Sequence, residues 1–155
     1  MVHGIPIKIR TVNELGNDEP KTVMFASVRK HPKLREFINK LDELEGKEQI
    51  ATRVLFASFE KLEDVKDKDR ATVEAASQKA QKEYQKIVTK RLETIQDFII
   101  EGMIGAGYGQ DNVDLYLPYF DPDRYQELIN RSLVGCGRLD FFAENSPAPE
   151  NLNSM

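Results

Sequence analysis

The sequence predicts an α+β fold that is predominantly α-helical, with an N-terminal β-hairpin packed on a helical bundle that contains one long helix. Three observations support this prediction. β-branched residues alternate with period two near the start of the 155-residue chain, which is typical of half-buried strands. Apolar residues then recur at spacings of three and four, as in amphipathic helices. Residues 69–104 contain no proline, and no glycine before Gly102, so a single long helix is expected there.

The first expected element is the β-hairpin. Ile5, Ile7 and Ile9 lie on one face of a strand over residues 4–10. The segment from Asn13 to Pro20 is rich in residues that favour turns, and residues 22–25 supply the returning strand. Because two strands alone are marginally stable in water, the hairpin has to pack on the helices.

Two amphipathic helices are expected next. The first covers residues 33–45 and ends before Gly46, where a left-handed C-terminal cap is least costly. The second covers residues 49–62, and Ile50 and Val54 widen its apolar face. Nine of the eleven residues in 60–70 are charged, with both signs mixed, which indicates a solvated corner between helices.

The long helix over residues 69–104 has two unlike halves. The second half carries enough large apolar residues for a core face, whereas the first half is thinly apolar. We therefore expect a helical arm around residues 60–86 that projects from the body or lies against a partner. The alternative is a helical hairpin, in which the preceding helix covers the same stripe. The stripe residues proposed for protein binding are Val73, Ala76, Ala80 and Tyr84.

The glycine-rich segment 102–109 is expected to end the long helix, with no regular helix within it. A short helix or turn over residues 112–119 follows. Asp121 and Pro122 then supply the N-cap and first position of a last helix, which Gly135 closes. Residues 1–142 are expected to form a single globular domain, and residues 143–155 a disordered tail, because that segment has no apolar pattern.

Composition excludes several classes of function. The chain has 22 basic and 26 acidic side chains, a net charge of −4, which argues against a general nucleic-acid binder. No apolar run approaches the length of about 20 residues that a membrane span requires. The single cysteine suits a reducing cytosol. Two histidines and one cysteine leave little material for metal or acid–base chemistry, so no cofactor is expected.

Three candidate chemical sites have simpler explanations. The glycine-rich segment lacks the spacing and the preceding strand of a phosphate-binding loop. The aspartates at 111, 114, 121 and 123 lack the register of a calcium loop. Cys136 would need a base to act as a nucleophile, and the only histidines, His3 and His31, lie far away in the sequence.

A dense apolar and aromatic run follows the glycine-rich segment. It packs in the core or forms a partly exposed patch on which an apolar peptide docks, since tyrosine combines apolar area with a polar tip. The residues proposed for protein binding are Leu115, Tyr116, Leu117, Tyr119 and Phe120.

The order of elements resembles the tail assembly chaperones of long-tailed bacteriophages. Near the start, Ile7-Lys8-Ile9, the segment 22–30 and the helix from Lys33 are similar to the family's hairpin and first helix. Near the end, residues 92–101 are similar to its helix before a short acidic and aromatic segment, here Asp111-Asn112-Val113-Asp114-Leu115-Tyr116. The resemblance covers about half of the chain, and residues 60–85 look like an added helical arm.

The resemblance implies a non-catalytic protein in the cytoplasm of an infected bacterial cell. Such a protein binds the tape-measure protein, keeps its apolar helices soluble and recruits tail-tube subunits. A homo-oligomer is compatible with this role. One alternative is a structural virion subunit of the neck, connector or baseplate. Another is a small cytosolic enzyme, which would require Cys136 beside His3 or His31. No nucleic acid, membrane or metal is expected as a partner.

Overall fold

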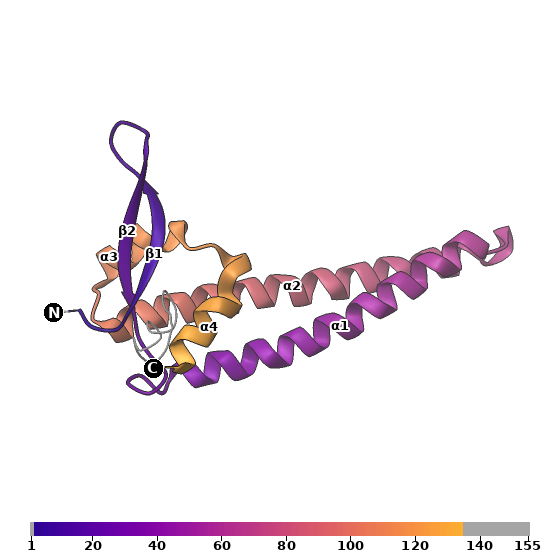
Figure 1. Ribbon diagram of the computed structural model, residues 1–155. Coiled ribbons are helices and arrows are strands. Elements are labelled where there is room, and N and C mark those ends of the chain that lie inside the picture. The colour runs from indigo at the N-terminus through magenta and orange to yellow at the C-terminus, as the bar shows by residue number, and fades with distance from the viewer. Residues whose placement is uncertain (1, 135–155) are drawn as a thin grey trace, which may run out of the picture. The chain divides into compact units, whose positions relative to one another are not determined.

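The computed structural model describes residues 2–134, and it confirms a predominantly helical fold with an N-terminal hairpin (Figure 1). The elements in chain order are β1 Ile5–Val12, β2 Asp18–Phe25, α1 Leu34–Asp64, α2 Arg70–Ala106, α3 Gln110–Tyr116 and α4 Tyr125–Val134. The chain divides into two compact units. The first is Met1–Ile38 with Ile95–Met155, and the second is Asn39–Thr94. Both long helices pass from one unit into the other.

The hairpin strands in the first unit are longer than the sequence predicts. β1 and β2 are antiparallel, and Val12 pairs with Asp18, so the turn is shorter than residues 13–20. The side chain of Asn13 closes it, because its Oδ1 accepts hydrogen bonds from the backbone N–H groups two and four residues further on (2.9 and 3.0 Å). Gly16 adopts a φ of +82° in this turn, a conformation that glycine accepts without steric cost.

Phe25, at the end of β2, is the centre of the core in the first unit. Its side chain is fully buried, and its ring centroid lies 5.3 Å from that of Phe98 and 6.5 Å from that of Phe120. A Cβ atom on Gly102 would overlap this ring. The next residue, Ala26, donates its backbone N–H to the carbonyl oxygen of Gly102 at 2.9 Å. The strand therefore lies directly against the backbone of α2.

The prediction that the segment 102–109 cannot remain regular helix is wrong, because α2 continues to Ala106. Its end is set by Gly107, which has a φ of +110°. The N–H of Gly107 donates to the carbonyl of Ile104 (3.0 Å), and the N–H of Tyr108 donates to that of Met103 (3.2 Å). This pair of bonds is a Schellman motif, which satisfies carbonyls that the helix leaves open.

The start of the last helix is close to the prediction. Asp121 accepts a hydrogen bond from the N–H of Asp123 at 2.9 Å, and one 3₁₀ turn over Pro122–Arg124 precedes α4. Ser132 in α4 is fully buried, and its hydroxyl donates to the carbonyl of Ala26 at 2.9 Å. α4 is thus tied to the segment that follows β2. The predicted cap at Gly135 and the predicted tail over 143–155 lie outside the described residues.

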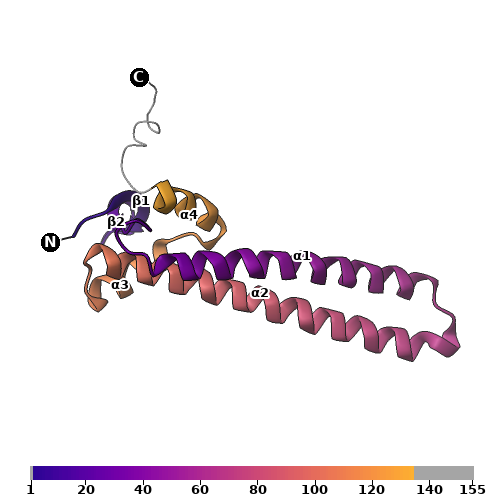
Figure 2. The same cartoon turned by 90° about the horizontal axis from the view of Figure 1, so that it is seen from below.

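In the second unit α1 is one continuous helix, so the prediction of a break at Gly46 is wrong. Gly46 has no positive φ, and glycine in a helix interior costs only about 1 kcal/mol relative to alanine. That penalty is small beside the packing of the helix on either side. Within this unit α1 and α2 run side by side in opposite directions (Figures 1 and 2). The helical hairpin, the alternative to a projecting arm, is therefore the observed arrangement, and the 3₁₀ turn Asp67–Asp69 lies in its connection.

Candidate protein-binding surfaces

The seam between the two helices of the second unit follows a coiled-coil pattern. On each helix the buried and half-buried side chains recur at alternating spacings of three and four, which is the repeat of two helices packed along their length. On α1 these positions are Leu41, Leu44, Glu48, Ala51, Leu55, Ser58 and Leu62; on α2 they are Val73, Ser77, Ala80, Tyr84, Ile87, Arg91 and Thr94.

One layer of this seam is an ion pair. Arg91 donates from Nε to Oε1 of Glu48 at 2.6 Å, with about a fifth and a quarter of the two side chains exposed. A polar pair at a seam position is satisfied only when the two residues lie opposite each other. It therefore favours one register of the two helices over alternatives shifted along the seam.

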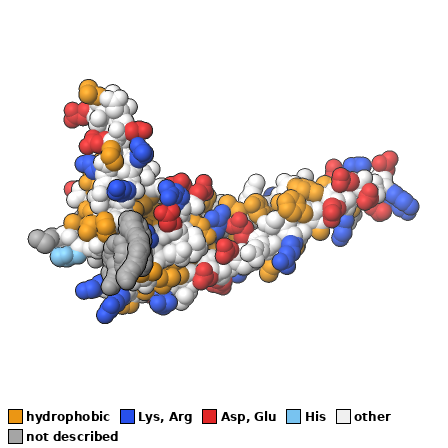
Figure 3. Space-filling view, viewed as in Figure 1, with side chains coloured by type: hydrophobic (Ala, Val, Ile, Leu, Met, Phe, Trp, Pro, Cys, Tyr) orange, Lys and Arg blue, Asp and Glu red, His pale blue; other side chains and the backbone are white. Residues whose placement is uncertain are grey.

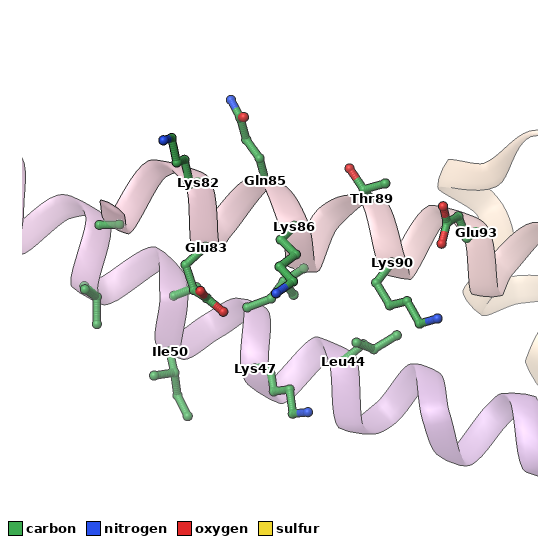
Figure 4. Close-up of a pocket in the computed structure, with 14 residues that line it drawn as sticks. Leu44, Lys47, Ile50, Lys82, Glu83, Gln85, Lys86, Thr89, Lys90 and Glu93 are labelled. Carbon is green, nitrogen blue, oxygen red and sulfur yellow. The ribbon is translucent and has the colours of Figure 1, made fainter. Parts of the chain in front are cut away.

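A groove of about 960 Å³ runs along one flank of the same helical hairpin (Figure 4). Its lining includes Leu44 and Ala51 from α1 and Ala80 and Ile87 from α2. On α1, Ile50 and Val54 also line it, with 61% and 53% of their surfaces exposed. The sequence predicts that these two residues widen the apolar face of the helix, and the structure places them outside the seam.

Lysines dominate the charged lining of the groove. Lys86 and Lys90 point from α2 toward α1, as does Glu83, and Lys47 lies on the α1 side (Figure 4). Lys47 is 3.6 Å from Glu43 in an exposed pair. Over residues 2–134, Lys86 and Lys90 form no ion pair within 4.0 Å. The groove thus combines an apolar strip with uncompensated positive charge.

Other apolar side chains of α1 are exposed away from this strip. Phe56 is 60% exposed and Phe59 39%, and neither lines the groove. Hydrophobic and charged side chains alternate along the surface of the two helices (Figure 3). Phe56 lies outside the groove and is about as exposed as Ile50, so it serves below as a matched reference for Ile50 and Val54.

The predicted stripe on α2 falls on the seam and beside it. Val73 and Tyr84 are half-buried and Ala80 is buried, all three at seam positions, whereas Ala76 is exposed. Ala80 also lines the groove. Sequence reasoning did not single out Lys86 and Lys90, because their place beside the groove depends on which face of α2 lies against α1.

The predicted aromatic run lies in the first unit and is split between surface and core. Leu115 is 58% exposed, and Tyr116, Leu117 and Tyr119 are half-buried. Phe120 is buried against the ring of Phe25. Tyr116 packs edge-on against Tyr108, with ring centroids 6.0 Å apart, which holds α3 to the segment after α2.

The residues considered for catalysis are placed only in part. His31 lies 2.7 Å from Glu101 through its Nε2 atom, and Lys33 approaches the other oxygen of the same carboxylate at 3.5 Å. Cys136 lies outside the described residues. Within residues 2–134 no group of three or more His, Cys, Asp or Glu side chains is arranged to hold a metal ion. In that same range no helix has the length and apolarity to cross a membrane.

Comparison of the chain with protein-family models, with curated proteins and with solved structures finds no match. Its function is therefore inferred from these surfaces and from the resemblance described in the sequence.

Proposed function

We propose that this chain is a non-catalytic protein-binding protein that uses its helical hairpin to hold an apolar segment of another chain. The observation that carries the proposal is the groove with Ile50 and Val54 exposed on its flank. The seam already has its own buried residues, so these two side chains are not needed to join α1 to α2. Apolar side chains gathered at a groove are typical of sites where another protein binds.

The resemblance supports a specific role, that of a phage tail assembly chaperone. In that role the partners are the tape-measure protein and tail-tube subunits, and the compartment is the cytoplasm of the infected bacterial cell. The tape-measure protein of this family's phages carries apolar helices that have to be kept soluble before assembly. Covering such helices requires surface area and no chemical step, so no residue of this chain acts as a catalyst.

The test is co-expression of the full chain with the tape-measure protein encoded by the same genome. The expected result is that the soluble fraction of the tape-measure protein rises and that both chains co-purify. A tape-measure protein that stays equally insoluble with and without the chain contradicts the chaperone role. Detection of the chain in purified virus particles contradicts it as well, and supports a structural virion subunit.

A further inference from the structure

We infer that the groove between α1 and α2 takes an acidic amphipathic α-helix as its occupant, which adds a third helix to the coiled coil. This inference rests on the proposed protein-binding function and specifies the chemistry of the partner. The observation that carries it is an apolar strip between two helices, bordered by Lys86 and Lys90, which form no ion pair within the described residues.

The shape of the site favours a helix. The groove follows two antiparallel helices, and the exposed Ile50 and Val54 lie four residues apart, one above the other on the same face of α1. A helix laid along such a groove presents its own apolar side chains at the same spacing. An extended strand would place alternate side chains away from the strip, and its backbone groups would find no sheet edge in this unit, whose described elements are all helical.

The floor of the groove allows a close approach. Ala51 and Ala80 are both buried on the seam and both line the groove. Their small side chains leave room in the floor of the groove for the large side chains of an incoming helix. Ile50 and Val54 on one side and the stem of Lys86 on the other would then flank those side chains.

The charges favour an acidic partner. Four lysines and two glutamates line the groove, the reverse of the balance in the whole chain, which carries 22 basic and 26 acidic residues. Lys86 and Lys90 point across the groove, with Glu83 as the carboxylate on the same side (Figure 4). Glutamates beside the apolar face of the occupant would pair with these lysines, and lysines there would be repelled. The sign of the groove therefore selects between partners of equal hydrophobicity.

The experiment uses two synthetic helical peptides of about four heptads and the full chain. Both peptides carry leucine at the core positions; one has glutamate and the other lysine at the flanking positions. Binding is measured by fluorescence anisotropy at low and high salt. The acidic peptide should bind at least about tenfold more tightly, and added salt should reduce that difference because it screens exposed charges. Equal binding of the two peptides overturns the inference.

Variants of the chain locate the binding. Lys86→Glu with Lys90→Glu should reverse the preference in favour of the basic peptide. Ile50→Ser with Val54→Ser should weaken binding of the acidic peptide about tenfold, because a few apolar anchor residues supply most of the binding free energy of an interface. Phe56→Ser, the matched control for an equally exposed apolar residue outside the groove, should leave binding unchanged. Circular dichroism verifies that each variant keeps its helical content, so a folding failure is not read as a loss of binding.

Two further outcomes are decisive. Sedimentation of the chain alone, if it shows an oligomer that Ile50→Ser with Val54→Ser dissociates, assigns the groove to a second copy and overturns the inference. A tape-measure protein that remains soluble with the groove variants also overturns it and excludes the helical hairpin as the binding site, yet leaves the chaperone role standing. Conversely, peptide binding without any effect on the tape-measure protein supports the acidic-helix site and contradicts the chaperone role.

Discussion

Replacement of Gly102 by alanine tests the packing at the centre of the first unit. The added Cβ would lie well inside the 3.0 Å limit that real Cβ contacts essentially never cross, and the atoms it meets belong to the ring of Phe25. That ring is fully buried and has Phe98 and Phe120 beside it, so it has no open space to move into. Overpacking of a core in this way costs about 1–3 kcal/mol.

A matched change elsewhere isolates the packing from the backbone effect. Gly46 also lies inside a helix, but a Cβ there meets no atom within 4 Å. Alanine is favoured over glycine in a helix interior by about 1 kcal/mol. We therefore expect Gly46→Ala to raise the free energy of unfolding by about 1 kcal/mol. Gly102→Ala should lower it by a net value of up to about 2 kcal/mol, after the same helical gain is subtracted from the packing cost.

The assay is urea unfolding followed by far-ultraviolet circular dichroism, with the free energy obtained by linear extrapolation. A second change, Phe25→Leu, removes the atoms that the new methyl group meets. In the Gly102→Ala background it should therefore cost less than in the wild type, which a double-mutant cycle measures. If Gly102→Ala stabilises the protein as much as Gly46→Ala does, the contact between Phe25 and Gly102 does not exist and the reasoning is refuted.

Three other changes give expected outcomes in the same unfolding assay. Arg91→Leu should lower the free energy of unfolding because it leaves Glu48 unpaired. Glu48→Leu together with Arg91→Leu should be neutral or stabilising by about 1–4 kcal/mol. A double variant that is less stable than Arg91→Leu contradicts this. Ser132→Ala should cost about 1–2 kcal/mol, because the buried carbonyl of Ala26 loses a hydrogen bond; an unchanged midpoint speaks against that bond. Gly107→Ala should cost about 1–2 kcal/mol, since its φ of +110° is strained for any residue with a Cβ, and a higher melting temperature would be the contrary result.

Hydrophobic spacing predicted the helices well because it reports a global property, the face that a helix buries. It failed for the helix ends, which were predicted from single glycines and their sequence neighbours. Gly46 resembles a helix stop, but glycine disfavours a helix interior by only about 1 kcal/mol relative to alanine. The packing of the helical turns on both sides of Gly46 outweighs that cost. Gly102 also resembles a stop, and its true role depends on Phe25, which is 77 residues away in the sequence. No local sequence pattern distinguishes a glycine that ends a helix from one that leaves space for a side chain packed against the helix.

The candidate site was predictable only as apolar surface. The sequence analysis assigned Ile50 and Val54 to the apolar face of their helix, and in the structure both are exposed. A strict count at spacings of three and four from Leu41 includes Ala51 and Leu55 and leaves both of them out of the seam. The positive charge of the groove was not predictable, because it arises when Lys47 of α1 and residues of α2 are brought to the same flank.

The division of the chain into one continuous and one interrupted unit has a consequence for synthesis on the ribosome. The helical hairpin of residues 39–94 is contiguous, so it can close as soon as it emerges. The β-hairpin cannot bury Phe25 until residues 95–134 follow, which takes a few seconds at ordinary elongation rates. During that interval the nascent chain exposes Phe25 while all residues that line the groove have already been made, so a partner of the proposed kind would meet the groove before the first unit has folded.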